Sequence, residues 1–264
     1  MATSLRAVLV DARASAIPHA SVRPSVAGVW ALGRIEARRM LLHPSFLIGI
    51  AFALFIMRGA SGSEGTRLDP AWLLGGILVG MLVGTVLSAN IAALRPRRDQ
   101  MQELFGALPA PPETRTVGVL AGLLLGPVAI SIVLAAVGWW ALRMDENIGP
   151  DIDVFLALQI PLTVAALGTI GVAIGRWVPS LLGGPVVIAA HIMTGIIWVV
   201  PWVLPTATDV DRPRHMIYLA AAITTWVALA LARDRRTAPR FAIAAGALAL
   251  GVVAAVQQVP PGGW

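Results

Sequence analysis

The sequence contains no cysteine and no lysine, and few of its residues are charged. Without cysteine the chain can form no disulfide and offers no thiolate to a metal ion. Without lysine it cannot contain the phosphate-binding loop G-x-x-x-x-G-K-[ST], so any ATP site on which it depends must lie on another chain. Charged residues are 13% of the 264 positions, against about 25% in soluble domains, which excludes an ordinary soluble domain.

Groups with catalytic or coupling chemistry are also scarce. The sequence has no H-E-x-x-H motif, no cluster of metal-binding residues and no visible pairing of a nucleophile with a base. We therefore expect no enzyme activity, no catalytic residues, and no metal or cofactor bound by this chain. No Asp or Glu lies in the middle of an apolar segment, which argues against a proton- or sodium-coupled carrier. We relate the net charge of +6 to the side of the membrane on which the arginines lie, and not to affinity for nucleic acid.

Long apolar runs dominate what is present, and hydrophobic residues make up 57% of the chain. These runs are much longer than the ~10-residue alternating segments of a membrane β-barrel. They predict an all-α polytopic membrane protein with six to seven transmembrane helices, preceded by an interfacial elbow helix. The predicted spans are residues 44–57, 71–94, 117–142, 154–175, 181–204, 215–232 and 241–256.

The spans form a single transmembrane domain, residues 44–257, and polar segments surround them. Residues 1–24 are expected to be a cytoplasmic tail, residues 25–43 the elbow helix, residues 95–116 a cytoplasmic loop, and residues 258–264 a tail. Trp30 and the arginines of the elbow suit the headgroup layer. The last apolar segment, 241–256, is short, so a span and an interfacial helix both remain open.

The arginines predict the orientation. If the N-terminus lies inside and seven spans alternate, fifteen of the twenty arginines fall inside and five outside. Six acidic residues fall inside and eight outside. The five outer arginines are Arg58, Arg67, Arg143, Arg212 and Arg214. The positive-inside rule therefore places the N-terminus in the cytoplasm, in a chain that we assign to a bacterial plasma membrane.

Small residues four positions apart occur in span 154–175, as Gly171 and Gly175. Longer rows with the same spacing occur in two other predicted spans. They are Gly76, Gly80 and Gly84 in span 71–94, and Gly118, Gly122 and Gly126 in span 117–142. This spacing places them in one stripe, along which two helices can approach closely. Packing within the bundle and a dimer face or sliding surface both remain open interpretations.

Two of the polar residues within the spans need an interpretation. His191, in span 181–204, is an ionisable group at membrane depth and hence a candidate for the substrate path. A neutral, structurally satisfied histidine is the alternative. Asn90 lies near the inner end of span 71–94, where we expect its side chain to reach the headgroups.

The stretch 95–116 is the longest polar interval between apolar segments. Within it Met101, Leu104, Phe105 and Leu108 follow the i, i+3, i+4, i+7 spacing of one helix face. Asp99 can cap this short helix, and the prolines that begin at Pro109 end it. A helix that rests on the bilayer and a helix that docks into a groove of another protein are both consistent with this pattern.

Two segments resemble the permease subunits of type-2 ABC exporters. They are ALGRIEARRMLLHPSFLIGI, residues 31–50, and QELFGALPAPPETRTVGVLAGLL, residues 102–124. The resemblance covers roughly residues 27–130, and the rest agrees only in hydropathy. In that family an amphipathic elbow precedes the first span, and the loop between the second and third spans inserts into the ATPase subunit. Seven apolar segments exceed the family's usual six.

The resemblance implies a transport function that needs partners. Glu103, Leu104 and Phe105 would match the coupling helix that docks on an ABC ATPase subunit, which would bind ATP and Mg²⁺. The chain would pair with a second permease, identical or related, and would export a hydrophobic or amphipathic substrate, because the path lacks buried charge. Import instead of export, and a non-transporting scaffold or accessory subunit, remain alternatives.

Overall fold

The computed structural model describes residues 25–61, 70–98, 111, 113–144, 154–178, 180–197 and 211–257. Every regular element in these ranges is a helix, which confirms the all-α prediction. The helices are α2 (Val26–Leu41), α3 (Pro44–Ser61), α4 (Pro70–Arg98), α6 (Glu113–Leu123), the π-helical turn η1 (Leu124–Val128), α7 (Ala129–Met144), α8 (Val154–Trp177), α9 (Gly183–Ile197), α10 (Arg212–Asp234) and α11 (Ala238–Gln257).

Five helices within these ranges are long and apolar enough to cross a membrane. They are Gly76–Arg98 of α4, Glu113–Met144 formed by α6, η1 and α7, Ala157–Trp177 of α8, and the whole of α10 and α11. α2 and α3 meet the same requirement only together, and would make a sixth span. The polytopic membrane architecture is therefore confirmed, and the short last segment, 241–256, lies within α11, which is one of the five candidate spans.

α9 is described over 15 residues, and the rest of the predicted span 181–204 lies outside the described residues. α9 packs against α4 and α8.

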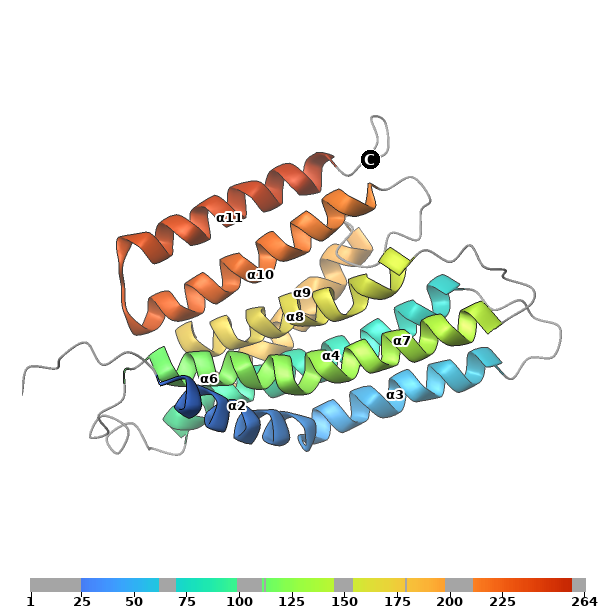
Figure 1. The fold of residues 1–264 in the computed structure, drawn as a ribbon, viewed down its shortest axis with the longest axis horizontal. Helices are drawn as coiled ribbons and strands as arrows, with labels where there is room; N and C mark the ends of the chain where they lie inside the picture. Colours follow the sequence, from blue (N-terminus) through green and yellow to red (C-terminus); the bar gives the residue numbers. More distant parts are fainter. Residues whose placement is uncertain are drawn as a thin grey trace, which may run out of the picture.

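α4 and α8 form the centre of the bundle (Figure 1). Of the apolar stretch of α4, 78% is buried inside the bundle, whereas only 17% of the apolar stretch of α11 is buried. α3 and α8 both pack against α4, α10 packs against α8, and α11 packs against α10. α10 and α11 thus make a hairpin at the edge of the bundle (top of Figure 1), where α11 exposes most of its apolar surface.

The N-terminal helix pair is bent. α2 begins after Ser25, whose hydroxyl oxygen accepts the N–H of Gly28 at 3.1 Å. It packs along α6 and η1, and its axis makes an angle of 61° with that of α3. The bend falls at Leu42 and His43, and α3 starts at Pro44, which suits the first turn of a helix because the N–H that proline lacks would be unpaired there.

Pro127 lies within the long helix Glu113–Met144 and would normally kink it, because proline has no N–H and its ring clashes with the preceding turn. Pro127 lies in η1, and the wider turn of this π-helical segment accommodates the proline ring. Next to it, Gly126 lies against α2, where a Cβ atom would stand only 3.2 Å from the carbonyl oxygen of Ala37.

The polar stretch 95–116 is helical at both ends, which corrects the expectation of a loop beginning at residue 95. α4 continues to Arg98, with Pro96 in its last turn, and α6 starts at Glu113. Arginines in the last turn of α4 and an acid in the first turn of α6 each complement the helix dipole. Tertiary contacts of these side chains, described next, hold the two ends in helical form.

Candidate functional site

The predicted docking residues Met101, Glu103, Leu104, Phe105 and Leu108 lie outside the described residues. The backbone of His191 lies in α9, but its side chain is likewise outside the description. What the structure describes is the pair of helix ends that flank residues 99–110 in the sequence. These helix ends are the last turn of α4 and the first turn of α6, which we call the two stems.

The stems lie at an end of the bundle that is rich in arginine. α2, α4, α6, α8 and the α10–α11 turn bring twelve arginines to this end, against three acids. The arginines are Arg34, Arg38, Arg39, Arg95, Arg97, Arg98, Arg115, Arg176, Arg233, Arg235, Arg236 and Arg240. The acids are Glu36, Glu113 and Asp234. Each of these acids forms two polar contacts, at least one of them with another helix or turn of this end, which makes the acids the organising groups.

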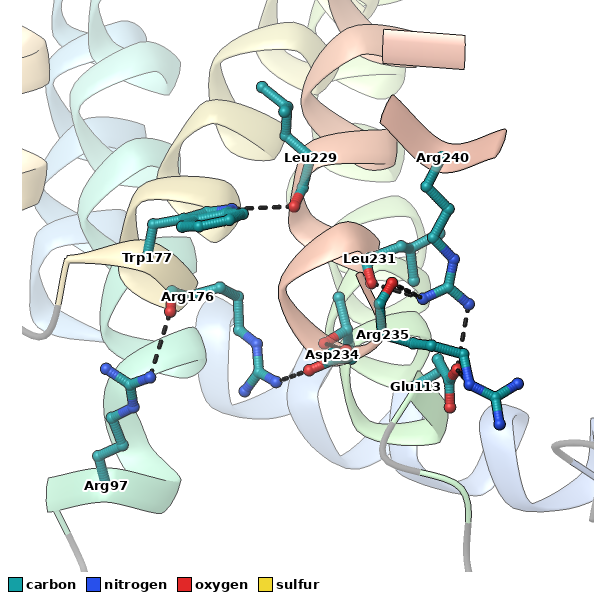
Figure 2. Close-up of polar contacts among 10 residues, drawn as sticks. Arg97, Glu113, Arg176, Trp177, Leu229, Leu231, Asp234, Arg235 and Arg240 are labelled. Atoms are coloured by element: carbon teal, nitrogen blue, oxygen red, sulfur yellow. Dashed lines mark hydrogen bonds and ion pairs between the residues drawn. The ribbon is translucent and has the colours of Figure 1, made fainter. Parts of the chain in front are cut away.

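Asp234 joins three helices. Its carboxylate forms an ion pair with Arg176 of α8 and accepts a hydrogen bond from the hydroxyl of Thr116 of α6. The Asp234 side chain is 2% exposed and that of Arg176 is 15% exposed, so this contact is largely withdrawn from solvent. Arg97 of α4 donates to the backbone oxygen of Arg176 at 3.3 Å (Figure 2). Both stems therefore contact the Arg176–Asp234 pair, the α4 stem at Arg176 of α8 and the α6 stem at Asp234 of α10.

Glu113 ties the α6 stem to the α10–α11 turn. Its carboxylate accepts from Nη2 of Arg240 at 3.1 Å and lies 3.8 Å from Nε of Arg235 (Figure 2). Nη1 of Arg240 also donates to the backbone oxygens of Leu231 and Arg235, at 2.6 and 3.1 Å. Arg240 thus closes the turn between α10 and α11 and holds it against α6.

Glu36 ties the α4 stem to α2. Its side chain is 7% exposed, and its two carboxylate oxygens accept from Nη1 of Arg39 at 3.0 Å and from Nη1 of Arg95 at 2.7 Å. Arg39 is on the same helix, whereas Arg95 comes from the last turn of α4. The contact therefore fixes the elbow to the helix that leads into residues 99–110.

Trp177, at the end of α8, connects this helix to α10. Its indole N–H donates to the backbone oxygen of Leu229 at 2.9 Å (Figure 2). The guanidinium groups of Arg233 and Arg236 lie 5.9 and 5.8 Å from the centre of the indole ring, at the limit of cation–π attraction. α8 and α10 are thus joined at this end by an ion pair, a hydrogen bond and a stacked aromatic ring.

The polar contacts of this end join helices to one another. Within the described ranges, no three His, Asp or Glu side chains gather in a way that could hold a metal ion. Ion pairs and hydrogen bonds connect the α4 stem to α2 and α8, and the α6 stem to α10 and α11. The two stems are therefore joined to most of the helices at this end.

The predicted glycine stripe of α4 faces α3. A Cβ at Gly80 would stand 2.5 Å from the carbonyl oxygen of Gly49, and a Cβ at Gly84 would stand 2.9 Å from Cα of Phe46. Gly76 lies similarly against Ile56. These distances leave no room for a side chain, so the stripe lets the two backbones touch.

The second stripe faces α2. Gly118 lies against Leu32, and Gly122 and Gly126 lie against the turn that contains Glu36 and Ala37. In the described structure both stripes are thus occupied by helices of the same chain.

Asn90 does not point to the headgroups, contrary to the expectation from its position. It is 1% exposed, and its Nδ2 donates to the backbone oxygen of Gly171 on α8 at 3.3 Å. Gly171 and Gly175 allow this approach, because a Cβ at either would lie 2.8 Å from a carbonyl oxygen of α4. The position near the end of a span is correct, but the close α4–α8 contact buries it.

Four residues that matter here were not singled out from the sequence. Glu36, Glu113 and Asp234 each stand among arginines, in RIEARR, PPETR and ARDRR, and an acid inside a basic segment is the signal that could have identified them. His215 was taken as the start of a span, yet it is fully buried in α10, with its ring 5.9 Å from that of Tyr218.

Comparison of the chain with protein-family models, with curated proteins and with solved structures finds no match.

Proposed function

We propose that this chain is the membrane-spanning subunit of an ATP-driven exporter, which receives mechanical energy from a separate ATPase at residues 99–110. The observation that carries the proposal is the construction of the two stems. Arg97 of the α4 stem and Thr116 of the α6 stem both contact the Arg176–Asp234 ion pair, which is largely buried. The two stems that flank the segment are therefore held by the same contact. A surface loop without a partner would not need the helices on either side of it to be held in this way.

The proposed docking face consists of Met101, Leu104, Phe105 and Leu108, with Glu103 beside it. An apolar helix face of this kind fits a hydrophobic groove in a partner. ATP and Mg²⁺ would be bound by that partner, since this chain has no lysine for a phosphate-binding loop.

Motion would reach the bundle through the stems. When the ATPase displaces residues 99–110, Arg95 would pull on α2 through Glu36, and Arg97 and Thr116 would act on α8 and α10. α4 would slide along α3 on its glycine stripe, where small residues leave a smooth contact. Closing of the ATPase would thus become a rearrangement of the helices.

The charge distribution supports a cytoplasmic location of this end. Twelve arginines lie at it, whereas the opposite end of the described structure has four, Arg58, Arg143, Arg212 and Arg214. Positive residues favour the cytoplasmic side of a membrane, where the ATPase would be available.

The cargo would be hydrophobic or amphipathic, and the chain would act as a pair with an identical or related permease. α11 and the outer face of α3 expose large apolar side chains, among them Phe55, Leu248 and Val253. Such surfaces fit lipid, a second permease, or a path for an apolar substrate between two bundles.

The test is to purify the full-length protein from its native membranes with any associated ATPase and to measure ATP hydrolysis. We expect Leu104→Arg and Phe105→Asp to abolish association or stimulated hydrolysis, because each places a charge on the apolar face. Gln102→Arg, about 100° away from that face, is the matched control and should retain both. If no ATPase accompanies the wild-type protein, or if both variants remain fully coupled, a non-transporting scaffold becomes the better account.

A further inference from the structure

A second basic site lies apart from the stems' shared contact, at the bend between α2 and α3. A groove of about 580 Å³ opens there. Its polar wall consists of Arg38, Arg39, Arg95 and His43, and its apolar wall includes Ile35 and Leu42. Ile35 and Leu42 are 50% and 61% exposed, so the groove faces the surroundings of the bundle and not its interior.

We propose that this groove binds the phosphodiester headgroup of an anionic glycerophospholipid, with the acyl chains lying along α3. This inference does not depend on the exporter proposal. It rests on the charge of the groove, on the way its arginines are held, and on the apolar surface that continues from it.

The groove carries excess positive charge. Three arginines face one carboxylate, that of Glu36, which pairs with Arg39 and Arg95. Within the described part of the chain no carboxylate pairs with Arg38, which is exposed on α2. A monoanionic phosphodiester would therefore reduce an unbalanced charge, and arginine is well suited to bind two phosphate oxygens at once.

Glu36 orients two of the arginines before any ligand binds. Among the described contacts it uses only Nη1 of Arg39 and Nη1 of Arg95. A guanidinium has five N–H donors, so both groups keep donors for a ligand. Their side chains are already fixed, which lowers the conformational entropy that binding must remove.

His43 adds a neutral donor. Its Nδ1 accepts the backbone N–H of Ser45 at 3.3 Å and lies 2.7 Å from the hydroxyl of Ser45. An acceptor at Nδ1 places the proton of the neutral ring on Nε2. A phosphate oxygen in the groove can accept that N–H.

The apolar continuation favours a lipid over a free phosphate. One turn beyond the bend, Leu47 and Ile48 on α3 are 48% and 69% exposed, and Phe55 further along is 72% exposed. Leu47 lies in the first turn of α3, where its backbone N–H donates to the carbonyl oxygen of His43 at 3.1 Å. Basic pockets of this kind, next to an apolar helix face, are typical sites for anionic headgroups.

The experiment is native mass spectrometry of the full-length protein in detergent, titrated with phosphatidylglycerol or with phosphatidylcholine of the same chains. We expect wild type to bind phosphatidylglycerol at least fivefold more tightly. Arg38→Gln should weaken this binding about fivefold, the factor that corresponds to the ~1 kcal/mol an arginine contributes near an anionic surface. Arg34→Gln, an exposed α2 arginine that does not line the groove, is the matched control and should leave it unchanged.

Two results of the lipid titrations would overturn the proposal. One is equal binding of the two lipids by wild type, which needs no variant to interpret. The other is an equal loss in Arg34→Gln and Arg38→Gln, which would indicate a diffuse effect of surface charge. Soluble glycerophosphoglycerol serves as the competitor without acyl chains. Competition by it at concentrations as low as the intact lipid would assign the groove to a free phosphate compound and contradict the lipid proposal.

Discussion

At the scale of single residues, Asp234 has the least exposed side chain of the three acids at the arginine-rich end. Its side chain is 2% exposed and contacts Arg176 and Thr116 from two other helices. Removing one partner of a buried ion pair leaves the other charge without compensation, which typically costs about 3–5 kcal/mol. Because Arg176 keeps some exposure, we expect the lower part of that range.

Asp234→Asn should therefore lower the melting temperature of the purified protein by about 5–10 °C, followed by intrinsic tryptophan fluorescence. Asp211→Asn is the matched control. Asp211 pairs with Arg214 at the opposite end, with side chains 38% and 48% exposed, and exposed pairs contribute about 0–1 kcal/mol. Equal shifts in the two variants would show that the network at the arginine-rich end does not hold the helices together.

The ionisation of His43 makes the stability of the folded protein depend on pH. Burial, and then the positive charge of Arg95, lower the pKa of its imidazole below the usual 6.5. The unfolded chain therefore takes up a proton before the folded one does as the pH falls. Stability is fully present above pH ~6.5 and is lost as the pH falls through the lowered pKa of the folded state.

We expect the melting temperature of wild type to decrease more between pH 7.5 and 5.5 than that of His43→Gln, which cannot titrate. The comparison cancels the effect of the other histidines. A decrease of the same size in both proteins would mean that His43 is as easily protonated in the folded state as in the unfolded chain.

The contacts of individual residues were the least predictable part of the structure. Thr116 and Asp234 are 118 positions apart, and Arg97 and Arg176 are 79 apart. No local pattern indicates which arginine will meet which acid. The sequence shows an acid among arginines, but the pairing depends on how the helices pack.

At the scale of helices, the contact of α4 with α3 depends on the absence of side chains. Gly80→Ala would place a Cβ 2.5 Å from the carbonyl oxygen of Gly49 and 3.1 Å from the backbone nitrogen of Ala53. Backbone atoms cannot move away alone, so α3 must shift as a whole. Overpacking of this kind typically costs about 1–3 kcal/mol.

Gly80→Ala should thus lower the melting temperature, whereas Gly246→Ala on α11 should leave it unchanged or slightly raise it. A Cβ at Gly246 meets nothing within 4 Å, and alanine favours the helix over glycine by about 1 kcal/mol. A stable Gly80→Ala variant would indicate that α3 and α4 are less closely packed than described.

Hydropathy predicted the helices well because a membrane span must be apolar along its length. Predicted span 215–232 corresponds to α10, Arg212–Asp234, and predicted span 241–256 to α11, Ala238–Gln257. The helical ends of the stretch 95–116 were missed for the opposite reason. Residues such as Arg97 and Glu113 are polar, and only partners on other helices show that they continue α4 and begin α6.

At the scale of the whole molecule, the orientation in the membrane can be tested directly because the chain has no cysteine of its own. Single-cysteine variants Arg236→Cys, at the arginine-rich end, and Met144→Cys, at the opposite end, both lie at exposed positions. On intact cells, a membrane-impermeant maleimide should label only the Met144→Cys variant. After lysis it should label both. Labelling of the Arg236→Cys variant on intact cells would reverse the proposed orientation.

The central claim is that residues 99–110 receive force from an ATPase. The most direct measurement replaces Phe105 by benzoylphenylalanine, a photo-reactive phenylalanine analogue, and irradiates native membranes. Trp140, 60% exposed near the opposite end, is the control position. We expect a cross-linked product between position 105 and a subunit that contains an ATP-binding phosphate loop, and none from position 140. Position 105 cross-linking only to lipid, or to proteins without a nucleotide-binding site, would contradict it.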